Sequence, residues 1–198
     1  MNRMFQGTVL ALAFVGSSLL AQDGRCIAQI YRAGEPRNTS DFEFDRTFPG
    51  DAKGAYSCSL GMRPSAMRKA LEQFRFGVLY NDATSIKSVI RFPVSAHVSK
   101  SLGVDAKTTT VTIHNVNEWF AFQEKYFSKA HTALVACAFL GNVTPMGGRS
   151  PGVMIGLGAF WFQSFVGSWK VRLTAVNLFP INADMVAKSC TPPGVEGN

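Results

Sequence analysis

Six residues have side chains that could form a ligand pocket or carry acid–base chemistry: Tyr80, Asp82, Tyr126, His131, Trp161 and Asn177. A carboxylate or an imidazole in an apolar pocket can take a proton from a substrate, so Asp82 and His131 are candidate general bases. The aromatic residues are candidates to line such a pocket, and Asn177 would form its polar end. The alternatives are structural: Asp82 as a helix N-cap, His131 as a hydrogen-bonded histidine, and the aromatic residues as ordinary core.

A serine motif in the last third of the chain has the letters of a nucleophile elbow. Residues 148–152 read Gly-Arg-Ser-Pro-Gly and fit the G-x-S-x-G pattern. An elbow needs a strand before the serine and a helix after it, whereas a loop is expected before Ser150 and a strand after it. The following residue must also donate its N–H to the oxyanion, and Pro151 has none. We interpret the motif as a turn.

The histidines do not have the spacing of a metal site. His97, His114 and His131 are far apart, and no two of them fall within one helical turn or across a short strand. Zinc ligands are usually grouped at such short spacings. Phosphate-binding loops and haem-attachment motifs are also absent from the sequence. We therefore expect no metal and no cofactor.

Residues 1–21 have the pattern of a secretory signal peptide. Arg3 precedes an apolar run over residues 8–20, and the segment ends in small residues up to Ala21. The run is shorter than the ~20 residues of a membrane-spanning helix and is typical of an export signal. We expect the mature chain to be exported, periplasmic or secreted, and to have no membrane span.

Export changes the interpretation of the cysteines, which are Cys26, Cys58, Cys137 and Cys190. An even number of cysteines in an exported chain predicts disulfides, and four cysteines allow three connectivities. We favour a Cys26–Cys58 bond, because it would close a polar segment that lacks a core of its own. We favour a Cys137–Cys190 bond, because it would tie the C-terminal tail to the end of a long helix.

The chain is basic, with 20 Lys and Arg residues, 13 Asp and Glu residues and a net charge of +7. The basic residues are scattered, and only Arg68 and Lys69 are adjacent. Nucleic-acid sites need clustered basic residues with stacking aromatics, so the pattern argues against nucleic acid as a partner. A basic body would instead be drawn to anionic partners.

Hydrophobic periodicity predicts helices and strands in the middle of the chain. The expected order is a helix over 65–80, a short helix over 82–88, strands over 89–98 and 108–114, and a long helix over 115–138. Ser65 and Asp82 are the expected N-caps of the first two helices. Pro93 predicts an edge strand or a bulge, because it has no N–H to donate.

The remaining segments complete the predicted organisation. Three strands are expected over 139–144, 153–162 and 169–177, and they would form antiparallel hairpins. Helices on one face of such a sheet give an α+β domain. The predicted regions are a signal over 1–21, an irregular disulfide-stapled extension over 22–60 with at most a short strand over 26–31, a domain over 61–180, and a tail over 181–198.

Several stretches resemble exported proteins of the NTF2-like superfamily. They are Asn81-Asp82, Ile-Arg-Phe-Pro-Val at 90–94, Trp119 with Tyr126-Phe127, Gly-Val-Met-Ile-Gly at 152–156, Phe-Trp-Phe at 160–162, Trp-Lys-Val at 169–171 and Ala-Val-Asn at 175–177. The resemblance covers residues 62–179 and implies a bent antiparallel sheet wrapped on helices into a cone. That group often carries an acidic residue before the aromatic strand, and Leu-Gly-Ala-Phe at 157–160 has none.

The cone hosts enzymes, carriers and interaction domains, so the resemblance does not fix a function. Because no usable catalytic constellation is found, we expect an exported, non-catalytic binding or protein-interaction module whose partner is an envelope protein or a small ligand. The alternatives are a pocket hydrolase or isomerase that uses Asp82 or His131, and a small-ligand carrier. Both alternatives need an apolar cavity with converging polar groups, and both lose support if Phe and Trp side chains fill the cone.

Overall fold

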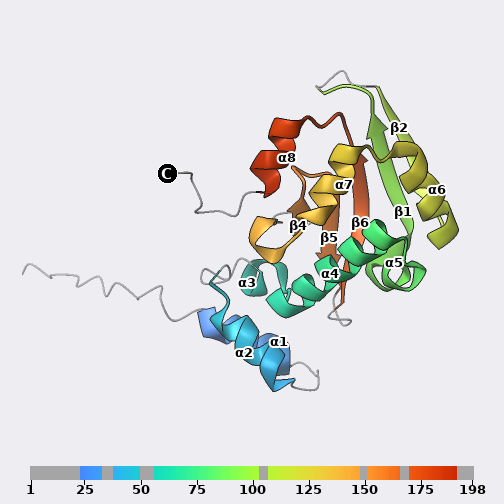
Figure 1. Ribbon diagram of the computed structural model, residues 1–198. Helices are drawn as coiled ribbons and strands as arrows, with labels where there is room; N and C mark the ends of the chain where they lie inside the picture. The colour runs from blue at the N-terminus through green and yellow to red at the C-terminus, as the bar shows by residue number, and fades with distance from the viewer. Residues whose placement is uncertain are drawn as a thin grey trace, which may run out of the picture.

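The computed structural model describes residues 23–32, 38–49, 56–102, 107–147, 151–165 and 170–190. The predicted signal peptide at 1–21 lies outside the described residues, as do residues 148–150 of the serine motif. The described chain is an α+β protein, as predicted, with helices packed against a six-stranded sheet (Figure 1).

The sheet is mixed, not purely antiparallel as expected. Its strands are β1 (Ile90–Ser99), β2 (Thr108–Ile113), β3 (Thr144–Met146), β4 (Gly152–Ile155), β5 (Phe160–Ser164) and β6 (Val171–Leu178), in the order β2-β1-β6-β5-β4-β3. The hairpins from β3 to β6 are antiparallel, as predicted. β1 pairs with β6 in parallel, and a register shift between Ile90 and Ser95 forms a bulge around Pro93. The bulge keeps Pro93 out of the regular pairing with β6.

Helices α4 (Pro64–Tyr80) and α5 (Ala83–Val89) follow the predicted pattern closely. α4 begins at Pro64 with Arg63 as its N-cap, so the prediction of Ser65 as the cap is wrong. Asn81 ends α4 in the left-handed conformation that asparagine tolerates. A Cβ on Gly77 would lie 2.6 Å from Cδ1 of Ile86. Glycine therefore allows α4 and α5 to pack closely.

The long helix predicted over 115–138 is two helices, α6 (Val116–Tyr126) and α7 (Lys129–Ala136). The chain is extended at Phe127, and the Ser128 side chain accepts a hydrogen bond from the His131 backbone N–H at the start of α7. A serine that caps a new helix competes with continuation of the old one. In Figure 1, α4 and α7 lie in front of strands β5 and β6.

The last third contains more than the three predicted strands. Residues 139–144 form a 3-10 turn, η3 (Leu140–Asn142), and then enter β3. The strand predicted over 153–162 is divided into β4 and β5, because Gly156, Leu157 and Gly158 adopt positive φ in a tight turn. Helix α8 (Ala183–Cys190) occupies the segment predicted as a tail.

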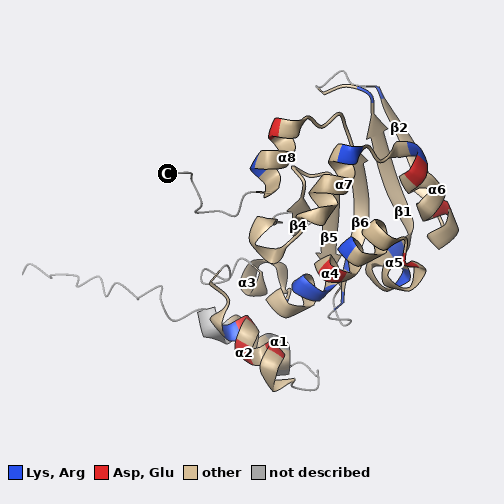
Figure 2. Cartoon of the chain, in the orientation of Figure 1, with Lys and Arg blue, Asp and Glu red and all other residues tan. Residues whose placement is uncertain are grey.

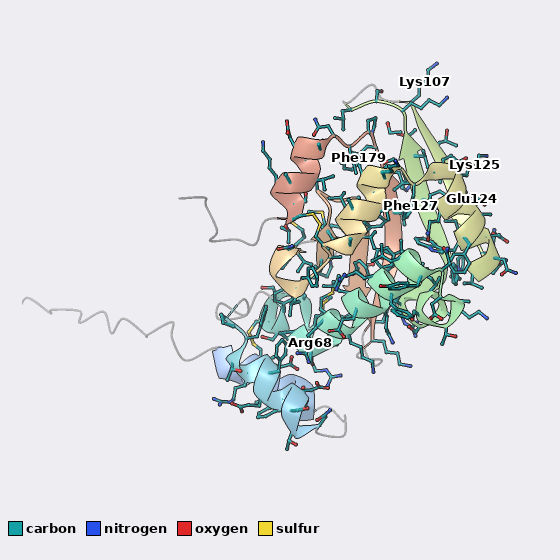
Figure 3. The ribbon with its side chains drawn as sticks, viewed as in Figure 1. Arg68, Lys107, Glu124, Lys125, Phe127 and Phe179 are labelled. Atoms are coloured by element: carbon teal, nitrogen blue, oxygen red, sulfur yellow. A yellow bond between two sulfur atoms is a disulfide. The ribbon has the colours of Figure 1, made fainter. Side chains whose placement is uncertain are left out.

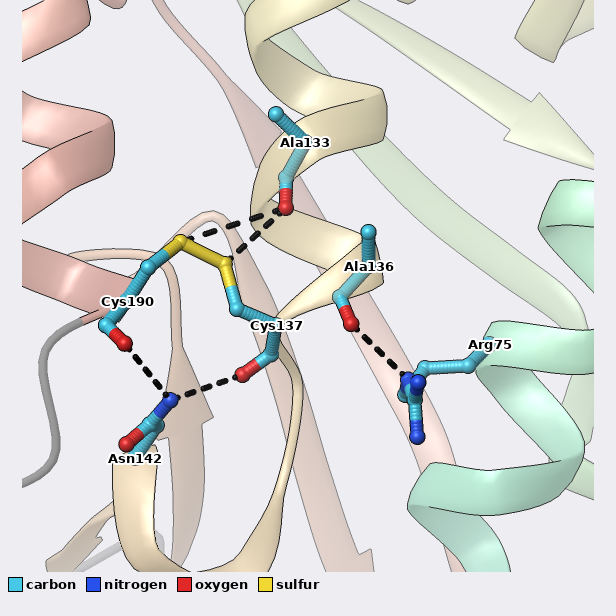
Figure 4. Close-up of a disulfide and its surroundings, with 6 residues drawn as sticks. All are labelled: Arg75, Ala133, Ala136, Cys137, Asn142 and Cys190. Atoms are coloured by element: carbon cyan, nitrogen blue, oxygen red, sulfur yellow. Dashed lines mark hydrogen bonds between the residues drawn. A yellow bond between two sulfur atoms is a disulfide. The ribbon is translucent and has the colours of Figure 1, made fainter.

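The predicted Cys137–Cys190 disulfide is confirmed, and it attaches α8 to the end of α7. Figure 4 shows that the Asn142 side-chain amide donates to the carbonyl oxygens of Cys137 and Cys190, at 3.0 and 3.4 Å. From α4, the Arg75 guanidinium donates to the Ala136 carbonyl at 3.0 Å. These contacts hold α4, α7 and α8 together at one end of the helical layer.

The prediction of an irregular segment over 22–60 is wrong for its described residues. They form α1 (Asp23–Arg32), α2 (Thr39–Thr47) and α3 (Ser57–Leu60), and α1 takes the place of the short strand expected over 26–31. Ile27 and Tyr31 are one helical turn apart in α1, and both are buried. The predicted Cys26–Cys58 disulfide is confirmed and links α1 to α3. The segment is therefore a stapled helical unit.

Candidate functional site

Aromatic side chains fill the space between helices and sheet where a cone would have its cavity. The Phe74 ring of α4 lies 6.1 Å from the Trp119 ring, 5.2 Å from the Phe160 ring and 5.4 Å from the Phe162 ring, measured between centroids. All four side chains are fully buried. Stacked and edge-to-face aromatic pairs at these distances pack as a solid core. This filling removes support from the pocket-enzyme and carrier hypotheses.

The six candidate site residues do not converge on one pocket. Tyr80 is 70% exposed at the end of α4, where its ring lies tilted 4.8 Å from the Phe76 ring. Asp82 is the predicted N-cap of α5 and accepts from the Ser85 backbone N–H at 2.6 Å. That hydrogen bond lowers the pKa of Asp82. A carboxylate held ionised by a helix N-terminus is a cap and a poor proton acceptor.

Tyr126 and His131 are the two candidates that share a cavity, a 270 Å³ hollow beside the link from β6 to α8. The Ser128 backbone N–H donates to Nδ1 of His131 at 3.0 Å, so Nε2 carries the proton and donates to the Phe179 carbonyl at 3.1 Å. Burial lowers the pKa of the His131 imidazole, and the bond to Phe179 opposes this shift. Figure 3 labels Phe127 and Phe179, which lie beside α7 near the link from β6 to α8. Nδ1 of His131 thus completes the capping box at the start of α7, and Nε2 joins α7 to the residue that follows β6.

Trp161 and Asn177 have structural contacts in the sheet. A Cβ on Gly152 would lie 2.7 Å from Nε1 of Trp161, so the indole covers β4 at this glycine. The Asn177 amide donates to the Gly158 carbonyl at 3.0 Å and supports the turn between β4 and β5. Among the described residues, no group of three or more His, Cys, Asp and Glu side chains could hold a metal ion.

A different site lies between α2, α4 and the start of β6. It is a cleft of about 540 Å³, which we call the cationic cleft. Its lining residues are Asn38, Asp41, Arg63, Ser65, Ala66, Lys69, Ala70, Gln73, Ser88, Lys170, Val171 and Arg172. Within the described ranges, four basic side chains and one carboxylate, that of Asp41, line this cleft. Figure 2 shows Lys and Arg gathered along α4 and α5 and at the adjoining end of the sheet.

Helical periodicity explains how α4 contributes to two surfaces at once. Residues Ala66, Lys69, Ala70 and Gln73 follow one another at spacings that place them on one side of the helix, and they line the cationic cleft. Phe74 faces the aromatic core from a neighbouring stripe of the same helix. The rigid helix thus fixes Lys69 relative to the sheet.

Arg172 is positioned by the C-terminal end of α5. Its Nη1 donates to the carbonyl oxygens of Lys87, at 3.2 Å, and of Ser88. A cation is favoured at a helix C-terminus, where the last carbonyl groups have no helical partner. The guanidinium is therefore fixed at the wall of the cationic cleft, while the exposed Lys170 side chain stands beside it.

The opposite wall is α2, and Asp45 holds it against α4. The Asp45 carboxylate is 2% exposed. It accepts from the Tyr31 hydroxyl at 2.7 Å, from the Ser65 backbone N–H at 2.6 Å and from the Ser65 hydroxyl at 2.8 Å. Burial and then the bond to Asp45 raise the pKa of Tyr31 to about 12. One buried carboxylate thus joins α1, α2 and the first turn of α4.

Arg68 adds an outer contact between the same two helices. Its guanidinium lies 4.0 Å from the centroid of the Phe44 ring, and its Nη2 lies 3.9 Å from Oδ1 of Asp41. In Figure 3 the Arg68 label stands where α2 meets α4. This contact draws the carboxylate of Asp41 to the edge of the cleft.

Sequence reasoning recognised the basic charge of the body but did not find the cationic cleft. Lys69 and Lys170 are 101 residues apart, and only the fold brings α4 beside the start of β6. A local signal exists at the start of α4, where the N-cap Arg63 and the helical residues Arg68 and Lys69 occur within about two turns.

Comparison with protein-family models, with curated proteins and with solved structures finds no match to this chain. None of the helices in the described residues is long and apolar enough to cross a membrane.

Proposed function

We propose that the chain is an exported, non-catalytic binding module that holds an anionic group of an envelope partner in the cationic cleft. The observation that carries the proposal is the cleft itself, where Arg63, Lys69, Lys170 and Arg172 converge around an open 540 Å³ space. The two disulfides suggest an oxidising environment and are consistent with export.

The chemistry of the cleft suits carboxylate and phosphate groups. A guanidinium presents a planar fork of N–H donors that matches either group, and lysine adds a mobile point charge. Arg172 is already held by the end of α5, so its ordering cost is met before a ligand binds. A partly fixed set of cations favours binding of an anion over loose counter-ion attraction.

The packing of the interior supports a binding role over catalysis. Asp82 and His131, the candidate bases, are engaged as a helix cap and as a link between elements. The aromatic core leaves the cone interior filled at Phe74 and Trp119. We also propose that the fold is a variant of the NTF2-like cone, because the predicted order of helices and strands over 62–179 is largely present.

Calorimetric titration of the oxidised protein, residues 22–198, with citrate and with inorganic phosphate tests the proposal. The double variant Lys69→Gln, Lys170→Gln should weaken binding about 2- to 30-fold, since each exposed ion pair contributes about 0.2–1 kcal/mol. The matched control is Lys125→Gln, Lys129→Gln, which removes the same charge outside the cleft lining. Equal loss in the two double variants, or no binding of either anion, contradicts the proposal.

A further inference from the structure

The cationic cleft continues into a second cavity. A hollow of about 460 Å³ lies next to it and is lined by Ile90, Arg91, Phe165, Lys170 and Arg172. Lys170 and Arg172 line both spaces, so the two cavities adjoin at these side chains, and we infer that together they make one groove. We call it the basic groove. It runs from the start of α2, past α4 and the start of β6, to the first residues of β1.

The basic groove carries a row of positive charge along its length. Arg63 and Lys69 line one part, Lys170 and Arg172 line the middle, and Arg91 lines the far part. In the part of the chain that the structure describes, Asp41 is the one carboxylate of the lining, and Arg68 lies 3.9 Å from it. Several cations along an extended groove favour a chain with repeated negative charges over a single small anion.

The neutral lining indicates the chemistry of that chain. Gln73 offers a side-chain amide in the lining, whereas Asn38 caps α2 and the Ser88 hydroxyl donates to the Ser85 carbonyl, and Ala66 offers a small apolar surface. Amide and hydroxyl groups can pair with peptide N–H and C=O groups. Small apolar residues can contact the methylene groups of acidic side chains.

The aromatic content of the groove argues against a nucleic acid. Strands of nucleic acid are held on aromatic side chains on which successive bases stack. Phe165 is the aromatic residue in the described lining, and the Arg91 guanidinium lies 4.3 Å above its ring. The guanidinium covers one face of this ring, so the described lining offers no row of aromatic faces on which successive bases could stack.

We propose that the basic groove binds an extended acidic peptide segment of a partner protein. This inference rests on the proposed function and names its ligand class. Carboxylates of the segment pair with Lys69, Lys170 and Arg172 in the cationic cleft, and further carboxylates reach Arg91. Its peptide groups bond to the side-chain amide of Gln73.

Titration with capped oligo-aspartates of increasing length tests the inference. Fluorescence anisotropy with labelled peptides of two, four and eight residues, on the oxidised protein at low salt, should show affinity rising at least about tenfold from the shortest to the longest, as for tethered sites in general. Arg91→Gln should weaken the eight-residue peptide several-fold and leave the two-residue peptide unchanged. Lys129→Gln, a charge-matched control on α7, should change neither affinity. Circular dichroism of each variant shows whether it is folded.

The outcomes separate the two proposals. If the short peptide binds in the cationic cleft but affinity does not rise with length, or if Arg91→Gln has no effect in a folded variant, the groove inference is overturned and the proposed function stands. If inorganic polyphosphate or single-stranded DNA of equal charge binds more tightly than the eight-residue peptide, the peptide assignment is overturned. If no anion binds, both proposals are overturned.

Discussion

Replacing Asp45 should separate the stapled helical unit from the rest of the protein. The carboxylate is buried and accepts three hydrogen bonds, from the Tyr31 hydroxyl and from the backbone N–H and hydroxyl of Ser65. Asp45→Ala removes all three acceptor contacts and leaves these donors buried without their partner. α2 then loses its main polar link to α4, and the cationic cleft loses one wall.

The size of the effect follows from the contacts. Hydrogen bonds to a charged group contribute about 1.5–3 kcal/mol each, while burying a carboxylate costs several kcal/mol, which the mutation recovers. The expected net loss for Asp45→Ala is about 3–5 kcal/mol, because three neutral donors are left buried at about 1–3 kcal/mol each and the recovered desolvation of the carboxylate offsets part of that sum. Asp45→Asn keeps the shape and one acceptor oxygen, so it should cost less, about 1–2 kcal/mol.

Urea unfolding of the oxidised protein, followed by circular dichroism, measures these losses. Asp41→Ala is the matched control, because Asp41 lies on the same helix and its partner Arg68 is 3.9 Å away at the surface. Its free energy of unfolding should change by less than about 1 kcal/mol. A loss below about 1 kcal/mol for Asp45→Ala, or equal losses for the two aspartates, would refute the role given to Asp45.

Three further changes test other parts of the fold. Gly77→Ala should lower the free energy of unfolding in urea by about 1–3 kcal/mol, because its Cβ would lie 2.6 Å from Cδ1 of Ile86. Adding Ile86→Val to the same chain should recover part of this loss. An unchanged free energy of unfolding for Gly77→Ala would show that α5 shifts freely. Folding lowers the pKa of His131 from 6.5, so the stability that its neutral form gives is present above pH 6.5 and falls as the pH drops below it. The unfolding free energy of His131→Gln should depend less on pH in that range, and identical pH profiles would count against the buried neutral imidazole. The double variant Cys26→Ala, Cys58→Ala removes the disulfide between two residues that are 32 positions apart. It should destabilise the protein by about 3–4 kcal/mol in the chain-entropy model. An unchanged urea midpoint would contradict a stabilising role for this disulfide.

Local sequence signals predicted the elements whose ends are marked by capping or helix-breaking residues. Asn81-Asp82 ends one helix and caps the next, and both boundaries are where the sequence places them. Alternating apolar residues located β1, and a short β-branched run located β2. The disulfide pairing followed from which segments lacked other means of attachment, and both bonds are present.

Other features depend on contacts that are distant in sequence. The helices of residues 22–60 are stabilised by the buried Asp45 cluster, which joins residues 14 and 20 positions apart and has no local pattern. The predicted long helix is interrupted at Ser128, which caps α7, although the apolar residues on either side keep helical spacing. Parallel pairing of β1 with β6 joins the first and the last strand of the sheet along the chain, and hydrophobic alternation alone does not say which distant strand is the neighbour.

The candidate site was the part of the structure that the sequence predicted least well. The sequence pointed to aromatic and titratable residues, because these residue types build most ligand pockets. In the fold, Trp161 and Asn177 support strands and turns, and the cations that do converge are ordinary surface residues when taken one at a time. Lys69, Lys170 and Arg172 become a site only when α4 packs beside β6.

The most direct test of the binding site is carbodiimide cross-linking to the oxidised protein. The probe is an eight-residue aspartate peptide whose amino terminus is blocked. The reagent joins a carboxylate to a lysine amine that lies in contact with it, and peptide mapping then locates each bond. We expect the cross-links at Lys69 and Lys170, the two lysines that line the cationic cleft. Cross-links spread evenly over Lys100, Lys125 and Lys188, or absent from Lys69 and Lys170, would contradict the assignment of the cleft as the binding site.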